Sequence, residues 1–351
     1  MFGLSVYLQD GALIKNLENI KKMADRGFNG IFTSMQLPED DESRILVFLE
    51  EVGKIAKEKQ MKFMVDVSAA YFKKQGLSTN KLDKLLRLGI NGIRADDGFS
   101  SQSIAEMSHQ MTVGLNASVL TQKDVEELKF YQADFDRLEA WHNFYPRPET
   151  GLSRAFLKKK NQQLKHQGFK TVAFVAGDSE RRYPLKKGLP TLEAHRYKSP
   201  FVSMLDLLSL DTDEIYIGDG GISEKSLNSF GQYGQEGLIP IEVEAVNARY
   251  NSQIFRIHQN RPDSARDVFR SRFSRSWGIS DIPSENCIER KKGAITLDNA
   301  SYGRYKGELQ LCKKSLPSDG KVNVIGQVIS EDLELLDYLN ENQKIILIER
   351  R

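Results

Sequence analysis

Three segments of the chain repeat one pattern: Arg26-Gly-Phe-Asn-Gly-Ile31, Leu88-Gly-Ile-Asn-Gly-Ile93 and Gln167-Gly-Phe-Lys-Thr-Val172. In each segment a glycine follows an amphipathic helical stretch, and a short turn then leads into apolar residues. Glycine at this position supplies the left-handed conformation that ends a helix. The repeat therefore predicts a unit of helix, tight turn and buried strand that recurs along the chain.

The first two-thirds of the chain alternate short apolar runs with helical patterns, which predicts a parallel sheet. Eight such units in about 235 residues are close to the ~250 residues of a (β/α)₈ TIM barrel. The alternative is a doubly wound sheet, but no G-x-G-x-x-G follows the first run. The predicted strands are Leu4–Leu8, Gly30–Ser34, Lys62–Val67, Gly92–Arg94, Val113–Ala117, Leu138–Asn143, Thr171–Ala176 and Glu214–Gly218. Helical patterns include Ile14–Arg26, Glu42–Lys59, Asn80–Leu88, Lys123–Gln132, Ser153–Gln167 and Leu192–Leu210.

The pattern changes near Ile239, after which the chain reads as strands and turns. Only Glu331–Tyr338 is strongly helical there, and turn signals such as Pro317-Ser-Asp-Gly320 separate the strands. We therefore predict a barrel domain over residues 1–237 and a second, mostly β domain over residues 238–351, such as a small barrel. Its predicted strands are Ile241–Ala245, Gly293–Leu297, Gly307–Leu311, Val322–Val328 and Ile345–Glu349.

The composition is that of an intracellular globular protein. The 351 residues are 40% hydrophobic and 28% charged, with a net charge of +2, which argues against nucleic acid or an anionic membrane as a partner. The two cysteines, Cys287 and Cys312, are too few for a disulfide framework and suit a reducing compartment. The N-terminus lacks the basic start of a signal peptide, and no apolar stretch reaches the roughly 18 residues of a membrane span. We expect a cytoplasmic protein.

Polar residues follow the predicted strands where a packed core would not select them. In a TIM barrel these positions meet at the face that carries the active site. Arg94 and Asp96 alternate with period two, so they lie on one face of their strand and must pair or bind a polar ligand. Taken by themselves, Arg94 and Asp96 could simply form a structural ion pair. The wider set indicates a ligand site: Asp66, Asn116, His142, Asn143, Tyr145, Asp178 and Asp219.

Carboxylates dominate this set, with Asp66, Asp96 and Glu193 as the leading candidates. Glycoside hydrolysis needs two carboxyl groups across the scissile bond, one of them able to donate a proton. For Glu193 a structural role is equally open, because Thr191 would serve as the N-cap of a helix and Glu193 would favour its dipole.

The five histidines form no metal-binding pair such as H-E-x-x-H, so we expect no metal and no cofactor. His142 is open to three readings: general acid, ligand of the substrate, or packed structural histidine. The second domain carries arginines interleaved with aromatic residues, which by default form a solvated face. Arg270 and Arg272 are alternatively candidates for holding a phosphate bidentately.

Several strings are specific enough to indicate a family: His142-Asn-Phe-Tyr-Pro146, Arg94-Ala-Asp-Asp-Gly-Phe99, Gly188-Leu-Pro-Thr-Leu-Glu-Ala-His-Arg196 and Tyr305-Lys-Gly-Glu-Leu-Gln310. Through them the chain resembles, over its whole length, the bacterial 6-phospho-N-acetylmuramidases. The resemblance implies a TIM barrel followed by a small cyclophilin-like β-barrel. It further implies cytosolic hydrolysis of the β-1,4 bond of 6-phospho-N-acetylmuramyl-N-acetylglucosamine in cell-wall recycling, with that small phosphorylated disaccharide as the binding partner. An oligomer is left open.

On this basis we expect two of the three carboxylates to act through an oxocarbenium-like transition state. We expect Glu193 to donate the proton, because a loop carboxyl in apolar surroundings has a raised pKa. Polar side chains would hold the sugar, and Arg94 or Arg196 would meet the phosphate or the lactyl carboxylate. The rivals are a sugar-phosphate isomerase or aldolase on the same barrel and a non-catalytic phosphosugar-binding protein.

Overall fold

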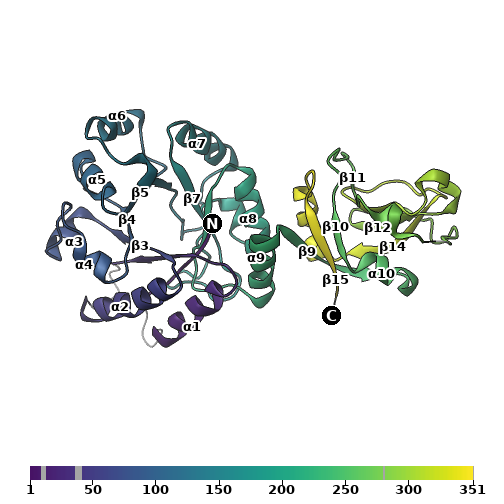
Figure 1. Ribbon diagram of the computed structural model, residues 1–351, viewed down its shortest axis with the longest axis horizontal. Coiled ribbons are helices and arrows are strands. Elements are labelled where there is room, and N and C mark those ends of the chain that lie inside the picture. Colours follow the sequence, from purple (N-terminus) through teal and green to yellow (C-terminus); the bar gives the residue numbers. More distant parts are fainter. Residues whose placement is uncertain (9–12, 36–41, 280, 351) are drawn as a thin grey trace. The chain divides into compact units, whose positions relative to one another are not determined.

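The computed structural model describes residues 1–8, 13–35, 42–279 and 281–350 (Figure 1). Contacts within the chain divide it into two compact units, Met1–Gly231 and Gln232–Arg351. The division falls inside helix α9 (Glu224–Glu236), whereas the boundary predicted from the sequence lies at the end of that helix. Each unit is described by itself below.

The first unit is a closed barrel of eight parallel strands in consecutive order, so the predicted TIM barrel is confirmed. The strands are β1 (Phe2–Ser5), β2 (Gly30–Ser34), β3 (Lys62–Val67), β4 (Gly92–Ala95), β5 (Thr112–Asn116), β6 (Leu138–Trp141), β7 (Lys170–Val175) and β8 (Glu214–Ile217). Around them lie helices α1 (Leu13–Ala24), α2 (Glu42–Glu58), α3 (Ala69–Lys74), α4 (Asp83–Arg87), α5 (Ser101–Ser108), α6 (Gln122–Phe130), α7 (Arg154–His166), α8 (Pro200–Ser209) and α9 (Figure 1).

One predicted helix is wrong in its extent. Residues 192–210 form two separate elements, the 3₁₀ turn η2 (Glu193–His195) and helix α8. Proline has no N–H to continue a helix and is favoured in its first turn, so Pro200 starts a new helix. The residues before it are therefore free to belong to the loop that follows β7.

Large side chains fill the middle of the barrel because glycines lie opposite them. Phe32, Met64, Trp141, Phe174 and Tyr216 are all buried in one cluster. A Cβ on Gly3 would lie 2.2 Å from the Tyr216 ring, one on Gly92 2.0 Å from the Met64 sulfur, and one on Gly114 2.7 Å from the Trp141 ring. These inward-facing glycines make room for the aromatic layer, which separates the two ends of the barrel.

Below this layer, at the amino ends of the strands, a lysine is buried with two glutamates. Lys62 Nζ lies 2.6 Å from carboxylate oxygens of both Glu139 and Glu214, and all three side chains are at most 15% exposed. Trp141 Nε1 donates a 2.9 Å hydrogen bond to Glu139. Burial, followed by the charge of Glu139, raises the pKa of Glu214. Lys62 pairs with both glutamates, and the pKa of Glu214 reflects its burial and the proximity of the two negative charges.

The second unit is a seven-stranded, mixed sheet in the order β10-β15-β9-β14-β12-β13-β11. An isolated antiparallel bridge between Asn260 and Ser271 joins the two edge strands, so the sheet nearly closes into a barrel. The strands are β9 (Leu238–Ala245), β10 (Ile257–Gln259), β11 (Val268–Arg270), β12 (Ala294–Asp298), β13 (Leu309–Cys312), β14 (Val322–Val328) and β15 (Lys344–Glu349). The predicted second β domain is confirmed, and β10 and β11 are additional to the strands expected from the sequence. This unit also contains helix α10 (Asn251–Ile254) and the 3₁₀ turns η3 (Ala248–Tyr250), η4 (Ser274–Trp277) and η5 (Ala300–Tyr305), and the first unit contains the 3₁₀ turn η1 (Phe135–Arg137).

The strongly helical segment of this unit is a 3₁₀ helix, η6 (Ser330–Tyr338). Leu333, Leu336 and Leu339 recur every three residues, and the last two are fully buried. A 3₁₀ helix has three residues per turn and places such positions in one row. The sequence therefore located the helix correctly but not its type.

Candidate active site

The carboxyl ends of the barrel strands surround a small cavity of about 160 Å³ above the aromatic layer. Active sites of TIM barrels lie at this end, because the βα loops meet there. The cavity combines apolar walls with a few charged and polar groups. It is lined by Tyr7, Phe32, Ser34, Asp66, Arg94, Asn143, Phe144, Phe174 and Arg182.

Arg94 is the centre of the polar wall. It is 5% exposed, and its Nη1 donates to Oδ1 of Asp66 at 2.5 Å and to Oδ1 of Asp96 at 3.0 Å. Its Nη2 donates to Oδ1 of Asn143 at 2.5 Å. Arg94 and Asp96 share a face and pair, which is one of the two outcomes expected for them from the sequence. Strands β3 and β4 place Asp66 beside Arg94, since their registered positions are neighbours.

The two aspartates of this cluster differ in environment. The Asp66 side chain is 16% exposed, and burial raises its pKa although the charge of Arg94 acts in the opposite direction. The Asp96 side chain is 39% exposed. Because both Oδ1 atoms contact the same Nη1, they lie no more than about 5.5 Å apart, an upper limit below the ~6.5–9.5 Å carboxyl separation of inverting glycosidases.

Residues 141–143, at the end of strand β6, differ in the direction of their side chains. Trp141 points into the barrel and Asn143 reaches the cavity, as residues two apart on a strand do. His142 between them faces α7, where its Nε2 lies 2.7 Å from Oδ1 of Asn161. It is fully buried, and burial lowers its pKa to about 4. The expectation that His142 binds the substrate is wrong, and its packed structural reading is correct.

Glu193 and Arg196 form a strap between the loops that follow β6 and β7. The Glu193 carboxylate accepts from Nε and Nη2 of Arg196, both at 2.6 Å, and from the backbone N–H groups of Glu149 and Gly151. These bonds, those from Arg196 first, lower the pKa of Glu193 to about 2. The expected raised pKa is therefore wrong, and with it the basis for Glu193 as the proton donor.

Arg196 is 1% exposed and all its donors meet protein acceptors. Nη1 donates to the carbonyls of Tyr145 and Gly188, while Nη2 also reaches the carbonyl of Arg147. The expectation that Arg196 binds the substrate is contradicted, because no N–H group is left for a ligand. Thr191 is no N-cap either: its hydroxyl donates to the carbonyl of Asn143.

Two further aspartates predicted for the rim have their oxygens engaged by protein groups. Asp219 is 1% exposed and accepts from the backbone N–H groups of Gly177, Arg182 and Leu189. Asp178 accepts from the backbone and hydroxyl of Ser223 and from Ser226, at the start of α9. Both anchor loops and helix ends. Asp219 is buried in this role, whereas Asp178 is exposed, and the expected contacts of these two residues with the substrate stay predictions.

Asn116 and Tyr145 remain near the mouth without lining the cavity. Asn116 ends β5 in register with the inward-facing Trp141, and its Oδ1 accepts from the N–H of Ser118. Tyr145 is half-buried, and its backbone carbonyl belongs to the Arg196 strap. Their expected contacts with the substrate stay predictions.

Four aromatic residues, one serine and one arginine of the cavity were not predicted from the sequence. Phe144 packs edge-on against Phe32 and Phe174, with ring centroids 6.5 and 5.1 Å apart. Tyr7 donates from its hydroxyl to the carbonyl of Gly218 at 2.7 Å, and the guanidinium of Arg182 lies 3.9 Å from the centre of its ring. Period-two alternation places Phe32 and Ser34 on the inward face, but no pattern links Arg182 to Tyr7.

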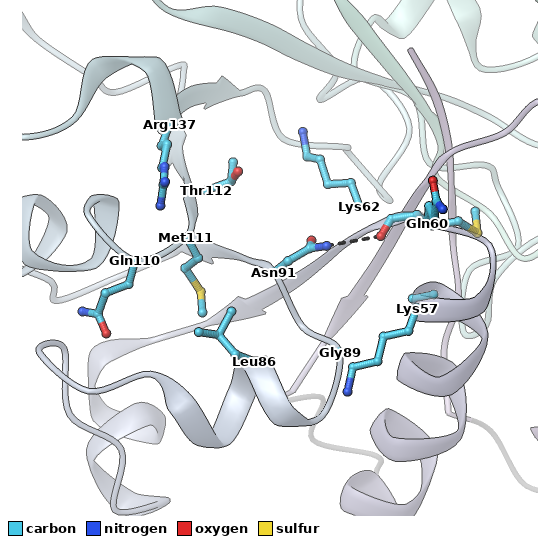
Figure 2. A pocket seen from close by; sticks show the side chains of 12 residues that line it. Lys57, Gln60, Lys62, Leu86, Gly89, Asn91, Gln110, Met111, Thr112 and Arg137 are labelled. Carbon is cyan, nitrogen blue, oxygen red and sulfur yellow. Dashed lines mark hydrogen bonds between the residues drawn. The ribbon is translucent and has the colours of Figure 1, made fainter.

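A larger hollow of about 610 Å³ lies at the opposite end of the barrel (Figure 2). Lys62, Asn91 and Thr112 line it at the starts of β3 to β5. Its polar groups serve the fold: Asn91 donates to the carbonyl of Met61 and accepts from the N–H of Phe63. The size of a hollow does not identify an active site, and we assign the smaller cavity, where acid and base groups converge.

The two candidate phosphate ligands of the second unit lie in different surroundings, and their expected contact with a phosphate stays a prediction. Arg270 forms a bidentate pair with Glu308 at 2.7 and 2.9 Å, which occupies the Nε and Nη2 edge of its guanidinium. Arg272 is exposed and stacks on Phe273, with 5.2 Å between guanidinium and ring centre.

Over residues 1–8, 13–35, 42–279 and 281–350, no helix has the length and apolar character needed to cross a membrane. The same ranges hold no group of three or more His, Cys, Asp or Glu side chains placed to bind a metal ion.

Comparison with known proteins agrees with the resemblance seen in the sequence. The family described as "6-phospho-N-acetylmuramidase, N-terminal" matches residues 2–232, and "6-phospho-N-acetylmuramidase, C-terminal" matches residues 238–348. A conserved protein of unknown function from Enterococcus faecalis is 41% identical, with a TM-score of 0.89, over 100% of this chain and 96% of that one. An uncharacterized B. cereus protein is 27% identical, with a TM-score of 0.81, over 99% of both chains. No curated protein matches significantly.

These matches cover both units, so they decide between the glycosidase and the rival readings of the barrel. An aldolase or a non-catalytic binding protein was compatible with the polar mouth alone, but not with a family match along the whole chain. The chain belongs to the 6-phospho-N-acetylmuramidase family, glycosidases of peptidoglycan recycling.

Proposed function

We propose that this chain hydrolyses the β-1,4 bond of 6-phospho-N-acetylmuramyl-N-acetylglucosamine in the mouth cavity, releasing 6-phospho-N-acetylmuramic acid and N-acetylglucosamine inside the cell. The observation that carries the proposal is the cluster in which one buried arginine, Arg94, holds both Asp66 and Asp96. It supplies two carboxyl groups of different environment within the spacing that glycoside hydrolysis uses.

Asp66 is the proton donor in this proposal. A general acid must hold its proton near neutral pH, and burial moves the pKa of Asp66 in that direction. Asp66 gives its proton to the glycosidic oxygen as the bond to the anomeric carbon breaks, and N-acetylglucosamine leaves with that oxygen. The resulting Asp66 carboxylate can then act as a base.

Asp96 is the second carboxylate. It is more exposed than Asp66, and Arg94 Nη1 donates to its Oδ1 at 3.0 Å. In a retaining sequence its oxygen forms a bond to the anomeric carbon as the leaving group departs. Water then attacks that carbon, transfers a proton to Asp66 and releases the Asp96 carboxylate, so both groups return to their starting states.

Asn143 and the aromatic wall position the sugar. Asn143 Oδ1 accepts from Arg94, so its amide nitrogen is directed to other acceptors such as a sugar hydroxyl or acetamido oxygen. Phe32, Phe144 and Phe174 exclude water from the reacting bond. Asn116 and Tyr145 complete the polar rim in this proposal.

Mass spectrometry of the protein incubated with the disaccharide, with and without its 6-phosphate, tests the function. We expect release of N-acetylglucosamine from the phosphorylated form only. Equal cleavage of both forms would remove the phosphate requirement, and cleavage of neither would remove the proposal. Proton NMR tests the stereochemistry by identifying the anomer of 6-phospho-N-acetylmuramic acid that forms first. The β anomer is expected, and the α anomer would exclude Asp96 as the nucleophile.

A further inference from the structure

Arg182 contributes a second positive charge to the mouth cavity, and this charge has no acidic partner in the described part of the chain. The contrast with its neighbours is clear. Arg94 binds two aspartates, and Glu180, two residues before Arg182, pairs with Lys15 at 2.6 Å. A partly enclosed cation of this kind favours an anion as its ligand.

The Arg182 backbone is held in place by a buried anchor. Its N–H donates to Oδ1 of Asp219 at 2.9 Å. The other oxygen of Asp219 accepts from Gly177 at 2.8 Å and from Leu189 at 3.0 Å, near the two ends of the same loop. Asp219 thus ties the loop at three points and presents Arg182 to the cavity.

The Arg182 side chain is held by a flat aromatic surface. Its guanidinium lies 3.9 Å from the centre of the Tyr7 ring, and Tyr7 is 5% exposed and fixed by its bond to Gly218. The Tyr7 side chain also accepts a hydrogen bond from Arg182, and stacking leaves the other N–H groups on the edge of the guanidinium available. The fork is therefore ordered before a ligand arrives, which reduces the entropy lost on binding.

We propose that Arg182 is the anion receptor of this active site and binds the anionic oxygens of the muramyl residue, from either its 6-phosphate or its lactyl carboxylate. The inference rests on the proposed function for the identity of the sugar. A guanidinium edge binds both anions in a bidentate way, and the apolar walls of the cavity strengthen the attraction. Arg182 then determines specificity without taking part in bond breaking.

Isothermal titration calorimetry with three monosaccharides tests the proposal on the full chain. 6-Phospho-N-acetylmuramic acid carries both anions, N-acetylglucosamine 6-phosphate only the phosphate, and N-acetylmuramic acid only the carboxylate. Arg182→Met should weaken binding of the first by about 10- to 100-fold, the effect of losing a charged hydrogen-bonded pair. Arg182→Lys should lie in between, because it keeps the charge without the fork.

Arg181→Met is the matched control. Arg181 stacks on Tyr197 at 5.7 Å and does not line the cavity, so this variant should bind like the wild type. If the anion is the phosphate, Arg182→Met also weakens binding of N-acetylglucosamine 6-phosphate and leaves N-acetylmuramic acid unchanged. If it is the carboxylate, the pattern is reversed.

Three outcomes overturn the inference: none of the sugars binds the wild type, Arg182→Met binds all three like the wild type, or Arg181→Met loses as much affinity. Circular dichroism checks that each variant is folded. If Arg182→Met does not fold, the affinity of Arg182→Lys decides the test. If the wild type binds the sugars but never cleaves the disaccharide, the proposed function is wrong and the anion-receptor role of Arg182 stands. If the wild type cleaves the disaccharide and Arg182→Met binds the sugars as tightly as the wild type, the proposed function stands and the anion-receptor role is wrong.

Discussion

Oδ1 of Asp66 accepts a 2.5 Å hydrogen bond from Nη1 of Arg94, across the boundary between strands β3 and β4. The pKa of Asp66 is nevertheless raised, because burial outweighs the charge of the arginine. A carboxyl group with these properties can keep a proton and still be oriented by a fixed donor.

Replacement of Asp66 by asparagine should lower kcat by about 10²- to 10⁴-fold, the usual contribution of a general acid, while the fold is retained. Asp178→Asn is the matched control, since Asp178 holds the start of α9 away from the cavity and should affect stability more than turnover. The rate of N-acetylglucosamine release measures the turnover of both variants. Near-normal turnover by folded Asp66→Asn would exclude Asp66 from the mechanism.

The pKa of Asp66 should depend on Asp96. The negative charge of Asp96 raises that pKa, so Asp96→Asn should lower it. Carbon-13 NMR of the Asp66 carboxyl, followed with pH in the wild type and in the variant, measures the shift. In the wild type, kcat/KM should fall as pH rises through the pKa of Asp66, because the donor loses its proton. An unchanged or higher pKa in Asp96→Asn would contradict the assigned coupling.

Glu193→Gln should reduce stability more than catalysis. It leaves the buried guanidinium of Arg196 without its anion, which costs about 1–3 kcal/mol of the free energy of unfolding. We expect kcat to fall less than ~10-fold, well below the loss of a general acid. Glu149→Gln is the control, because only its backbone joins the strap. A loss of turnover equal to that of Asp66→Asn would restore Glu193 as a proton donor.

The same pair predicts a pH dependence of stability. The pKa of Glu193 is lowered from 4.5 to about 2 in the folded chain. Its contribution is therefore complete above the unfolded pKa and is lost as pH falls through the folded one. The difference in free energy of unfolding between wild type and Glu193→Gln should shrink as pH falls from 5 toward 2, as urea unfolding measures. A constant difference would argue against the ion pair.

Lys62→Met tests the charge cluster at the other end of the barrel. It leaves Glu139 and Glu214 buried together and should lower the free energy of unfolding at neutral pH by about 3–5 kcal/mol. Because the pKa of Glu214 is raised in the folded chain, this destabilisation should diminish as pH falls and the carboxyl takes up a proton. Urea unfolding at several pH values measures the effect.

Lys59→Met is the control for this cluster, since Lys59 pairs with the exposed Asp25 at the surface and should be nearly neutral. Turnover of folded Lys62→Met should match the wild type, because the aromatic layer separates the cluster from the mouth. A variant as stable as the wild type at pH 7 would show that the lysine does not compensate the glutamates.

Local patterns were enough to predict most of the fold. Strands β2 and β3 begin and end where the apolar runs do, and the three repeated glycine turns lead from a helix into β2, β4 and β7. Alternation along β4 correctly paired Arg94 with Asp96. These features depend on neighbours within a few residues, where backbone geometry alone sets which side chains share a face.

Residues of the loops were assigned less well. His142 and Asn143 are adjacent in one specific string, yet one is buried against α7 and the other reaches the cavity. Glu193 looked like a free loop acid, and only the folded chain brings Arg196 and two N–H groups around it. Charge, burial and pKa depend on partners that sequence separation does not reveal.

The sequence by itself determined the barrel, the second β domain and, through its specific strings, the family. The tertiary structure decided which polar residues have groups left for a ligand. Asp219, Arg196 and Glu193 form hydrogen bonds with loop residues, whereas Arg182 lines the cavity without an acidic partner in the described ranges. The reason is physical: periodicity is a property of the local backbone, whereas hydrogen-bond partners are supplied by segments that meet only when the barrel closes.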